Sequence, residues 1–129
     1  MSRRDLAWLL PAVAYAGLIF WLSHQPNPLP ALSASVSDKV LHAVEYAGLA
    51  WLLALGLSHL GRLGPRRTLL LAVLLAAAYG ATDELHQAFV PNRFADVLDW
   101  LADGAGALVG GILAAPFLRR WGARASIRP

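Results

Sequence analysis

The hydrophobic residues of this chain fall into four long stretches, which are separated by short polar connections. The stretches cover residues 6–22, 40–60, 68–90 and 97–118. Each is close to the ~20 residues that an α-helix needs to cross the ~30 Å hydrocarbon core of a bilayer. None shows the apolar and polar alternation that is typical of a membrane β-strand. The pattern therefore predicts an all-α, polytopic membrane protein, a bundle of four transmembrane helices that forms a single domain over residues 1–129.

The composition supports this class and excludes others. Hydrophobic residues make up 57% of the chain and charged residues 15%, with a mean hydropathy of +0.51. The net charge is +3, but the basic residues lie at the ends of the apolar stretches, whereas a nucleic-acid-binding protein gathers them on one exposed face. We expect no nucleic-acid partner. Because there is no cysteine, disulfides and thiolate metal sites are excluded.

The arginines predict the orientation of the bundle. They form three groups, which are Arg3 and Arg4, then Arg62, Arg66 and Arg67, then Arg119, Arg120, Arg124 and Arg128. Positively charged connections stay on the cytoplasmic side, so the N- and C-termini are predicted to be cytoplasmic. The other two connections carry only Lys39 and Arg93 as basic residues and are predicted to lie outside.

The first stretch has a second interpretation, as a secretory signal. Arg3 and Arg4 precede it, and residues 31–34 offer small side chains for cleavage. Against this interpretation, the stretch is longer than a usual signal core, and Trp8 and Trp21 near its ends suit interfacial anchors. Cleavage would leave three helices.

Ionisable residues gather toward the predicted outer ends of the last three helices. A charged side chain at the bilayer centre costs roughly 2.5–3.5 kcal/mol on insertion scales, so such positions are informative. Spacings of three or four residues place them on one face of each helix. Glu45 lies seven residues inside Asp38, Asp83 seven residues inside Val90, and Asp103 seven residues inside Asp96, which is about 10 Å along a helix in each case. We therefore predict that these side chains meet in one outward-opening pocket.

Such a pocket suits acid–base chemistry on an anionic lipid. Crowded carboxylates in a medium of low dielectric cannot all be ionised without cations, so pairs such as Glu45 and Asp83 can divide the acid and base roles. Arg93 at the mouth can present a bidentate fork to a phosphate. The candidate acid–base residues are His42, Glu45, Asp83, Glu84, Asp99 and Asp103. The candidate substrate-binding residues are Asp38, Lys39, Tyr46, Gln87 and Arg93.

Two further kinds of chemistry are open from the sequence. His42 with two or three carboxylates could hold a divalent metal, although the spacings match no specific metal motif. Whether a metal or another cofactor binds therefore stays open. We expect no serine or lysine among the buried polar groups, which limits a covalent nucleophile to a carboxylate or His42.

Every candidate also has a structural interpretation. The buried acids can form a polar network with Lys39 and Arg93 that has no chemical role. The remaining interpretations are helix caps for Asp38 and Asp96, contact with headgroups for His86, solvation for His24 and His59, hydrogen bonds between helices for Tyr46, Tyr79 and Gln87, and close helix packing for Gly106 and Gly110.

Three blocks of sequence, in order, carry a family resemblance. They are Ser37-Asp38-Lys39-Val40-Leu41-His42 with Glu45-Tyr46, then Asp83-Glu84-Leu85-His86-Gln87-Ala88-Phe89-Val90-Pro91-Asn92-Arg93, then Asp99-x-x-x-Asp103-x-x-Gly106. Over residues 37–111 the chain resembles the VanZ-like family. Asn92 stands where that family usually has glycine, and both residue types tolerate a positive φ. Asp96 is additional to the pattern.

The resemblance implies a bacterial cytoplasmic (inner) membrane protein, and the family's namesake is associated with low-level resistance to the glycopeptide teicoplanin. It implies no reaction, so whether the protein is an enzyme stays open, as does its oligomeric state. The leading hypothesis is a site that binds or modifies an anionic, lipid-linked substrate of the cell envelope. The alternatives are a non-catalytic envelope factor, which binds lipid or partner helices through its glycine stripe, and an ion-coupled transporter. The apolar inner halves of the helices argue against transport.

Overall fold

The computed structural model describes residues 3–26, 36–61 and 63–125, with side chains for 5–26, 36–61 and 63–119. The helices are α1 (Arg3–Ala7), α2 (Leu10–Ser23), α4 (Asp38–His59), α5 (Pro65–Gln87) and α6 (Val97–Ala125). Four helical segments are long and apolar enough to cross a membrane, namely Asp5–Ser23, Asp38–His59, Pro65–Gln87 and Val97–Arg119. The prediction of an all-α protein with four membrane spans is confirmed for the described residues. Residues 31–34, which bear on signal cleavage, and Arg62 lie outside them.

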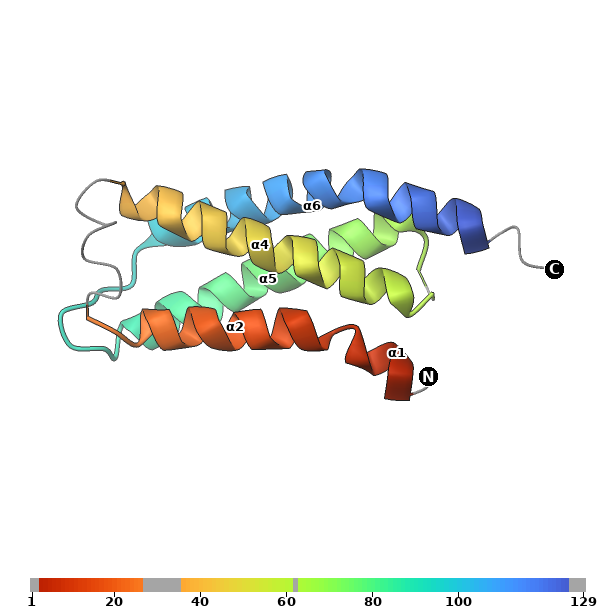
Figure 1. Cartoon of the computed structure of the whole chain (residues 1–129). Coiled ribbons are helices and arrows are strands. Elements are labelled where there is room, and N and C mark those ends of the chain that lie inside the picture. The colour runs from red at the N-terminus through yellow and green to blue at the C-terminus, as the bar shows by residue number, and fades with distance from the viewer. Residues whose placement is uncertain (1–2, 27–35, 62, 126–129) are drawn as a thin grey trace.

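The helices form one bundle with two distinct ends (Figure 1). Helices α4, α5 and α6 pack on one another, and α2 lies against α4 and α5. Both chain termini lie at one end, which we call the termini end. At the opposite end α2 and α5 finish and α4 and α6 begin, and we call this the polar end.

Several helix boundaries differ from those expected, among them the starts of α4 at Asp38 and of α5 at Pro65, and three differences have a physical reason. A turn at Trp8 and Leu9 divides the first stretch into α1 and α2 just before Pro11, whose ring and missing N–H disfavour an uninterrupted helix. Helix α5 ends at Gln87 and not at Val90, because the last amides form tight i→i−3 bonds that lead into Pro91. Helix α6 runs past Leu118 to Ala125, since arginine favours helix and hydrophobic length marks only the part in lipid.

Small residues set the distance between α4 and α6. A Cβ atom on Gly106 would overlap the carbonyl oxygen of Ala43, and one on Gly110 would overlap that of Ala47. No side chain fits in this space, so the prediction that these glycines allow close helix packing is confirmed. Toward the termini end the same helices and α5 meet through Ala54, Ala72, Ala114 and Leu118. The close contact at Gly106 and Gly110 fixes the positions of α4 and α6, and therefore of the side chains that they carry to the polar end.

Candidate functional site

Buried polar side chains are concentrated at the polar end of the bundle. Among the buried polar side chains of the described residues, only Thr68 lies toward the termini end, where its hydroxyl donates to backbone carbonyls. The others come from all four spans and are Ser23, His42, Asp83, Glu84, Gln87, Asp99 and Asp103. Together with Lys39, Arg93 and Asp96, which contact them, we call these residues the polar cluster.

The deepest part of the polar cluster joins α4, α5 and α6 around His42. The His42 Nδ1 atom lies 2.9 Å from Asp103 Oδ1 and 3.8 Å from Glu84 Oε1. Asp103 is fully buried, and the other two side chains are less than a tenth exposed. Asp103 fits because α5 has glycine opposite it, where a Cβ on Gly80 would lie 2.7 Å from Asp103 Oδ2. The three predicted residues therefore share one buried space.

Asp83 connects this region to α2. The Ser23 hydroxyl donates to Asp83 Oδ2 over 2.7 Å, and both residues are buried. The expectation that no serine lies among the buried polar groups was therefore wrong. A lone serine at the end of an apolar stretch gives no spacing signal, so only the packing of α2 against α5 could show it. Gln87, one helical turn after Asp83, donates to both Asp83 and Glu84.

Lys39 forms a second layer nearer the loops. Its Nζ atom lies 2.7 Å from Asp99 Oδ1 and 2.9 Å from Asp96 Oδ2. Asp96 also caps α6, because its Oδ1 accepts the Leu98 amide, and its own amide donates to Glu84. The hydrogen bond from Lys39, and then that from the Leu98 amide, hold the pKa of Asp96 below its ordinary value. Asp96, which stood outside the family pattern, is thus part of the polar cluster.

A turn after α5 positions Arg93. The Arg93 amide donates to the Val90 carbonyl, with Pro91 and Asn92 between them, and Asn92 has a φ of 63°. These are the features of a type II turn, which needs a residue that tolerates positive φ at its third position. The expectation for Asn92 is confirmed. The guanidinium then donates through Nε and Nη2 to Gln87 Oε1, at 3.1 and 2.7 Å.

Three predicted residues lie nearby without a hydrogen bond to any residue that the structure describes. Glu45 is half-buried, with His42, Asp83 and Asp103 close enough to interact electrostatically. Asp38 is exposed in the first turn of α4, where a negative charge is favourable. Tyr46 is fully buried, and its hydroxyl has no partner. It therefore does not form the helix-to-helix bond expected of it, whereas Tyr79 does, to the Ala16 carbonyl at 2.7 Å.

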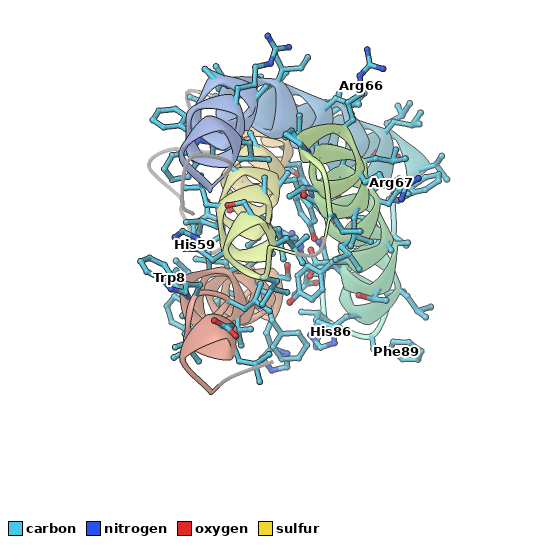
Figure 2. The ribbon with its side chains drawn as sticks, turned by 90° about the vertical axis from the view of Figure 1, so that its right-hand side faces the viewer. Trp8, His59, Arg66, Arg67, His86 and Phe89 are labelled. Atoms are coloured by element: carbon cyan, nitrogen blue, oxygen red, sulfur yellow. The ribbon has the colours of Figure 1, made fainter. Side chains whose placement is uncertain are left out.

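The remaining histidines lie apart from the polar cluster. The His86 ring packs at a tilt against Phe20, and its Nε2 atom lies 3.3 Å from His24 Nδ1 on the outside of the bundle. His59 stacks on Trp8 at the termini end, with ring centroids 3.8 Å apart (Figure 2). Arg66 and Arg67 point away from the bundle at the start of α5, at the end opposite Arg93 (Figure 2).

The bundle and its polar cluster define a class, that of a polytopic membrane protein with an ionisable site built between its spans at one end. A family model described as VanZ/LLP1 matches residues 6–119. The chain belongs to this family. No curated protein and no solved structure matches it.

Proposed function

We propose that this protein binds or modifies an anionic lipid, or a lipid-linked precursor, of the bacterial cell envelope at its polar end. The observation that carries the proposal is the chain of contacts from Arg93 through Gln87 to Asp83 and Glu84. It links a cation near the loops to buried carboxylates through one neutral side chain. Family membership supports a membrane setting, and the arginines near the termini support an outward-facing polar end.

Arg93 is the residue best prepared to hold a phosphate. Two of its five guanidinium N–H groups donate to Gln87, and it forms no ion pair within the described residues. Nη1 and one Nη2 hydrogen thus remain for a bidentate contact. Lys39 already contacts two carboxylates, so we assign it a secondary role in binding. Asp38, Tyr46 and Gln87 complete the proposed binding residues.

The bound headgroup would meet the acid–base candidates directly. A hollow of about 240 Å³ beside Glu84 and Asp96 is lined by α5, the end of the α5–α6 connection and the start of α6. A headgroup there would adjoin Glu84, with His42 and Asp103 behind it. Proton transfer would use these residues with Glu45, Asp83 and Asp99. If the lipid is a cell-wall precursor, a link to glycopeptide resistance is part of the same proposal, because a glycopeptide meets this target on the outer face.

Phosphate binding is tested with Arg93→Gln, and Arg66→Gln serves as the matched control at the opposite end of the bundle. Native mass spectrometry would measure the binding of phosphatidylglycerol and of zwitterionic phosphatidylcholine to the protein in detergent. A hydrogen bond to a charged group contributes about 1.5–3 kcal/mol, so Arg93→Gln should weaken phosphatidylglycerol binding about tenfold or more. Arg66→Gln should not. Equal losses in the two variants, or no preference for the anionic lipid, would contradict the proposal.

Modification is separated from binding by the single amide variants of Glu45, Asp83 and Asp99. If the protein modifies a lipid, these variants should change the lipid profile of the membrane at unchanged protein level. An unchanged profile together with normal phosphatidylglycerol binding would favour the non-catalytic envelope factor. In that case we expect its ligand to be lipid and not a partner helix. Helix α4 already packs against Gly106 and Gly110, so these glycines offer no free surface to another helix.

A further inference from the structure

Three side chains from different helices place metal-ligating atoms around one point in the polar cluster. The donor atoms of His42, Glu84 and Asp103 all lie within 4.8 Å of one another, and all three residues are buried. We infer that His42, Glu84 and Asp103 bind one divalent transition-metal cation, of the class of Zn²⁺ or Mn²⁺. The inference does not rest on the proposed lipid function, because it requires only these three side chains.

Unpartnered polar atoms beside the three donors point to a missing ligand. Tyr46 Oη, Asp83 Oδ1 and Asp103 Oδ2 are buried and lack a hydrogen-bond partner in the part of the chain that the structure describes. Tyr46 and Asp103 are fully buried, and Asp83 is 3% exposed. Asp83 and Asp103 both lie near enough to Tyr46 to interact electrostatically. Such atoms are costly unless an ion or its bound water satisfies them.

The balance of charge also favours a cation. Asp83, Glu84 and Asp103 are buried carboxylates. Within the described residues His42 contacts Glu84 and Asp103, whereas Asp83 contacts only the neutral Ser23 and Gln87. Lys39 is held by Asp96 and Asp99, and Arg93 by the neutral Gln87. Burying an unpaired charge costs several kcal/mol. A divalent ion would offset two of these negative charges at once.

The donor set and its spacing suit a transition metal. One imidazole nitrogen with carboxylate oxygens is a donor set used for Zn²⁺ and related ions, whereas Mg²⁺ prefers oxygen ligands and water. Two ligands about 2.1 Å from an ion are about 3.0–3.4 Å apart for angles between 90° and tetrahedral. The His42 distances of 2.9 and 3.8 Å to Asp103 and Glu84 bracket this range. On binding, the proton that His42 shares with Asp103 would pass to solvent.

A second set of donors is less suitable. Asp38, His42 and Asp99 also lie within 4.8 Å of one another. However, Asp38 is exposed, and Asp99 already accepts a hydrogen bond from Lys39 over 2.7 Å. The His42–Glu84–Asp103 set is buried throughout and lies beside the unpartnered atoms.

Calorimetry tests the site on the full-length protein in detergent, after removal of metal with EDTA and exchange into metal-free buffer. We expect one Zn²⁺ per chain, with Mn²⁺ binding competitively and Mg²⁺ not displacing it. His42→Gln and Asp103→Asn should each weaken Zn²⁺ binding by more than about 100-fold, since loss of a supporting residue alone costs 10–100-fold. His86→Gln is the matched control, because its imidazole lies outside the polar cluster. Arg93→Gln should bind Zn²⁺ normally, which separates this inference from the lipid proposal.

X-ray absorption of the zinc-loaded protein gives a measurement that does not depend on variants. The expected spectrum contains one imidazole and otherwise oxygen ligands. Two imidazoles, or a loss of binding in His86→Gln, would assign the ion to the His24–His86 pair and overturn the inference. The inference would also be overturned if the unsubstituted protein bound Zn²⁺ no more tightly than His42→Gln does.

Discussion

Near the termini end, α4, α5 and α6 meet through Ala54, Ala72, Ala114 and Leu118, whereas at the polar end the same helices meet through hydrogen bonds and ion pairs. The apolar contacts depend on shape, because lipid tails are as apolar as the side chains and burial alone does not drive the helices together. The polar contacts depend on partners for the buried charges, because a buried charged or polar group that loses its partner is costly.

The comparison teaches that the two regions tolerate change differently. The close approach at Gly106 and Gly110 holds α4 against α6 between the two ends. An added atom there must displace a helix backbone. In the polar cluster, a substitution of equal size leaves the helices in place but removes a partner from a buried charge. Substitutions that disturb the packing of α4 on α6 should therefore reduce stability most. Substitutions in the polar cluster should reduce stability less but should weaken ligand binding.

The largest expected effect is at Gly106. In Gly106→Ala the new Cβ would overlap the Ala43 carbonyl oxygen, so α4 and α6 must separate. Overpacking typically costs 1–3 kcal/mol and occasionally more, and we expect about 3 kcal/mol here because the obstacle is backbone. Unfolding by SDS in mixed micelles would measure this change in the free energy of unfolding.

Gly104→Ala is the matched control, since a Cβ at Gly104 would meet no atom within 4 Å. Alanine should leave stability unchanged there or raise it by less than about 1 kcal/mol, as expected for a glycine inside a helix. Equal losses at the two positions would show that α4 and α6 do not approach closely in the membrane protein.

A smaller effect is expected for the contact between His42 and Asp103. The double-mutant cycle of His42→Gln and Asp103→Asn, measured by the same unfolding assay in EDTA, isolates their interaction from other losses. A hydrogen bond to a charged group contributes about 1.5–3 kcal/mol, so we expect a coupling of about 2 kcal/mol. A coupling near zero would mean that the 2.9 Å contact contributes nothing to folding and that the two ends do not differ as described.

The sequence was sufficient to predict the parts of the fold that the bilayer constrains. Four spans of the required length followed from hydrophobicity, and the cost of charge in lipid marked the positions of the ionisable residues as informative. Contacts such as His42 with Asp103 bear out the expectation that separate helices share one polar region. The positive φ of Asn92 followed from its residue type.

Other features depend on how the helices are rotated against one another, which spacing does not determine. Spacing assigns His42 and Glu45 to one face of α4, yet within the described residues His42 is hydrogen bonded and Glu45 is not. The sequence placed both Lys39 and Arg93 among the binding residues, but it did not show that Lys39 contacts two carboxylates and Arg93 an amide. Ser23 was missed because one hydroxyl forms no pattern. The end of α5 was placed too late because hydrophobicity continues through the turn at Val90.

The smallest expected effect concerns Asp96, at the exposed edge of the polar cluster. Its pKa is lowered below 3.8, first by Lys39 and then by the Leu98 amide, so its charged form is favoured in the folded state. A group with a lowered pKa adds stability above its unfolded pKa and loses it as the pH falls through the lower folded value. Asp96→Asn should therefore lower the unfolding midpoint slightly at pH 7, and the difference from the unsubstituted protein should shrink below pH 3.8.

Asp5→Asn is the comparison for loss of a carboxylate elsewhere in the bundle, because Asp5 lies in α1 at the termini end, away from Lys39. Unfolding midpoints of the three proteins would be compared between pH 3 and pH 7. High salt should reduce the Asp96 effect further, since exposed ion pairs are screened. A loss in Asp96→Asn as large as that in Gly106→Ala would contradict the comparison of the two regions. It would mean that the outermost ion pair, and not the packing of α4 on α6, holds the bundle together.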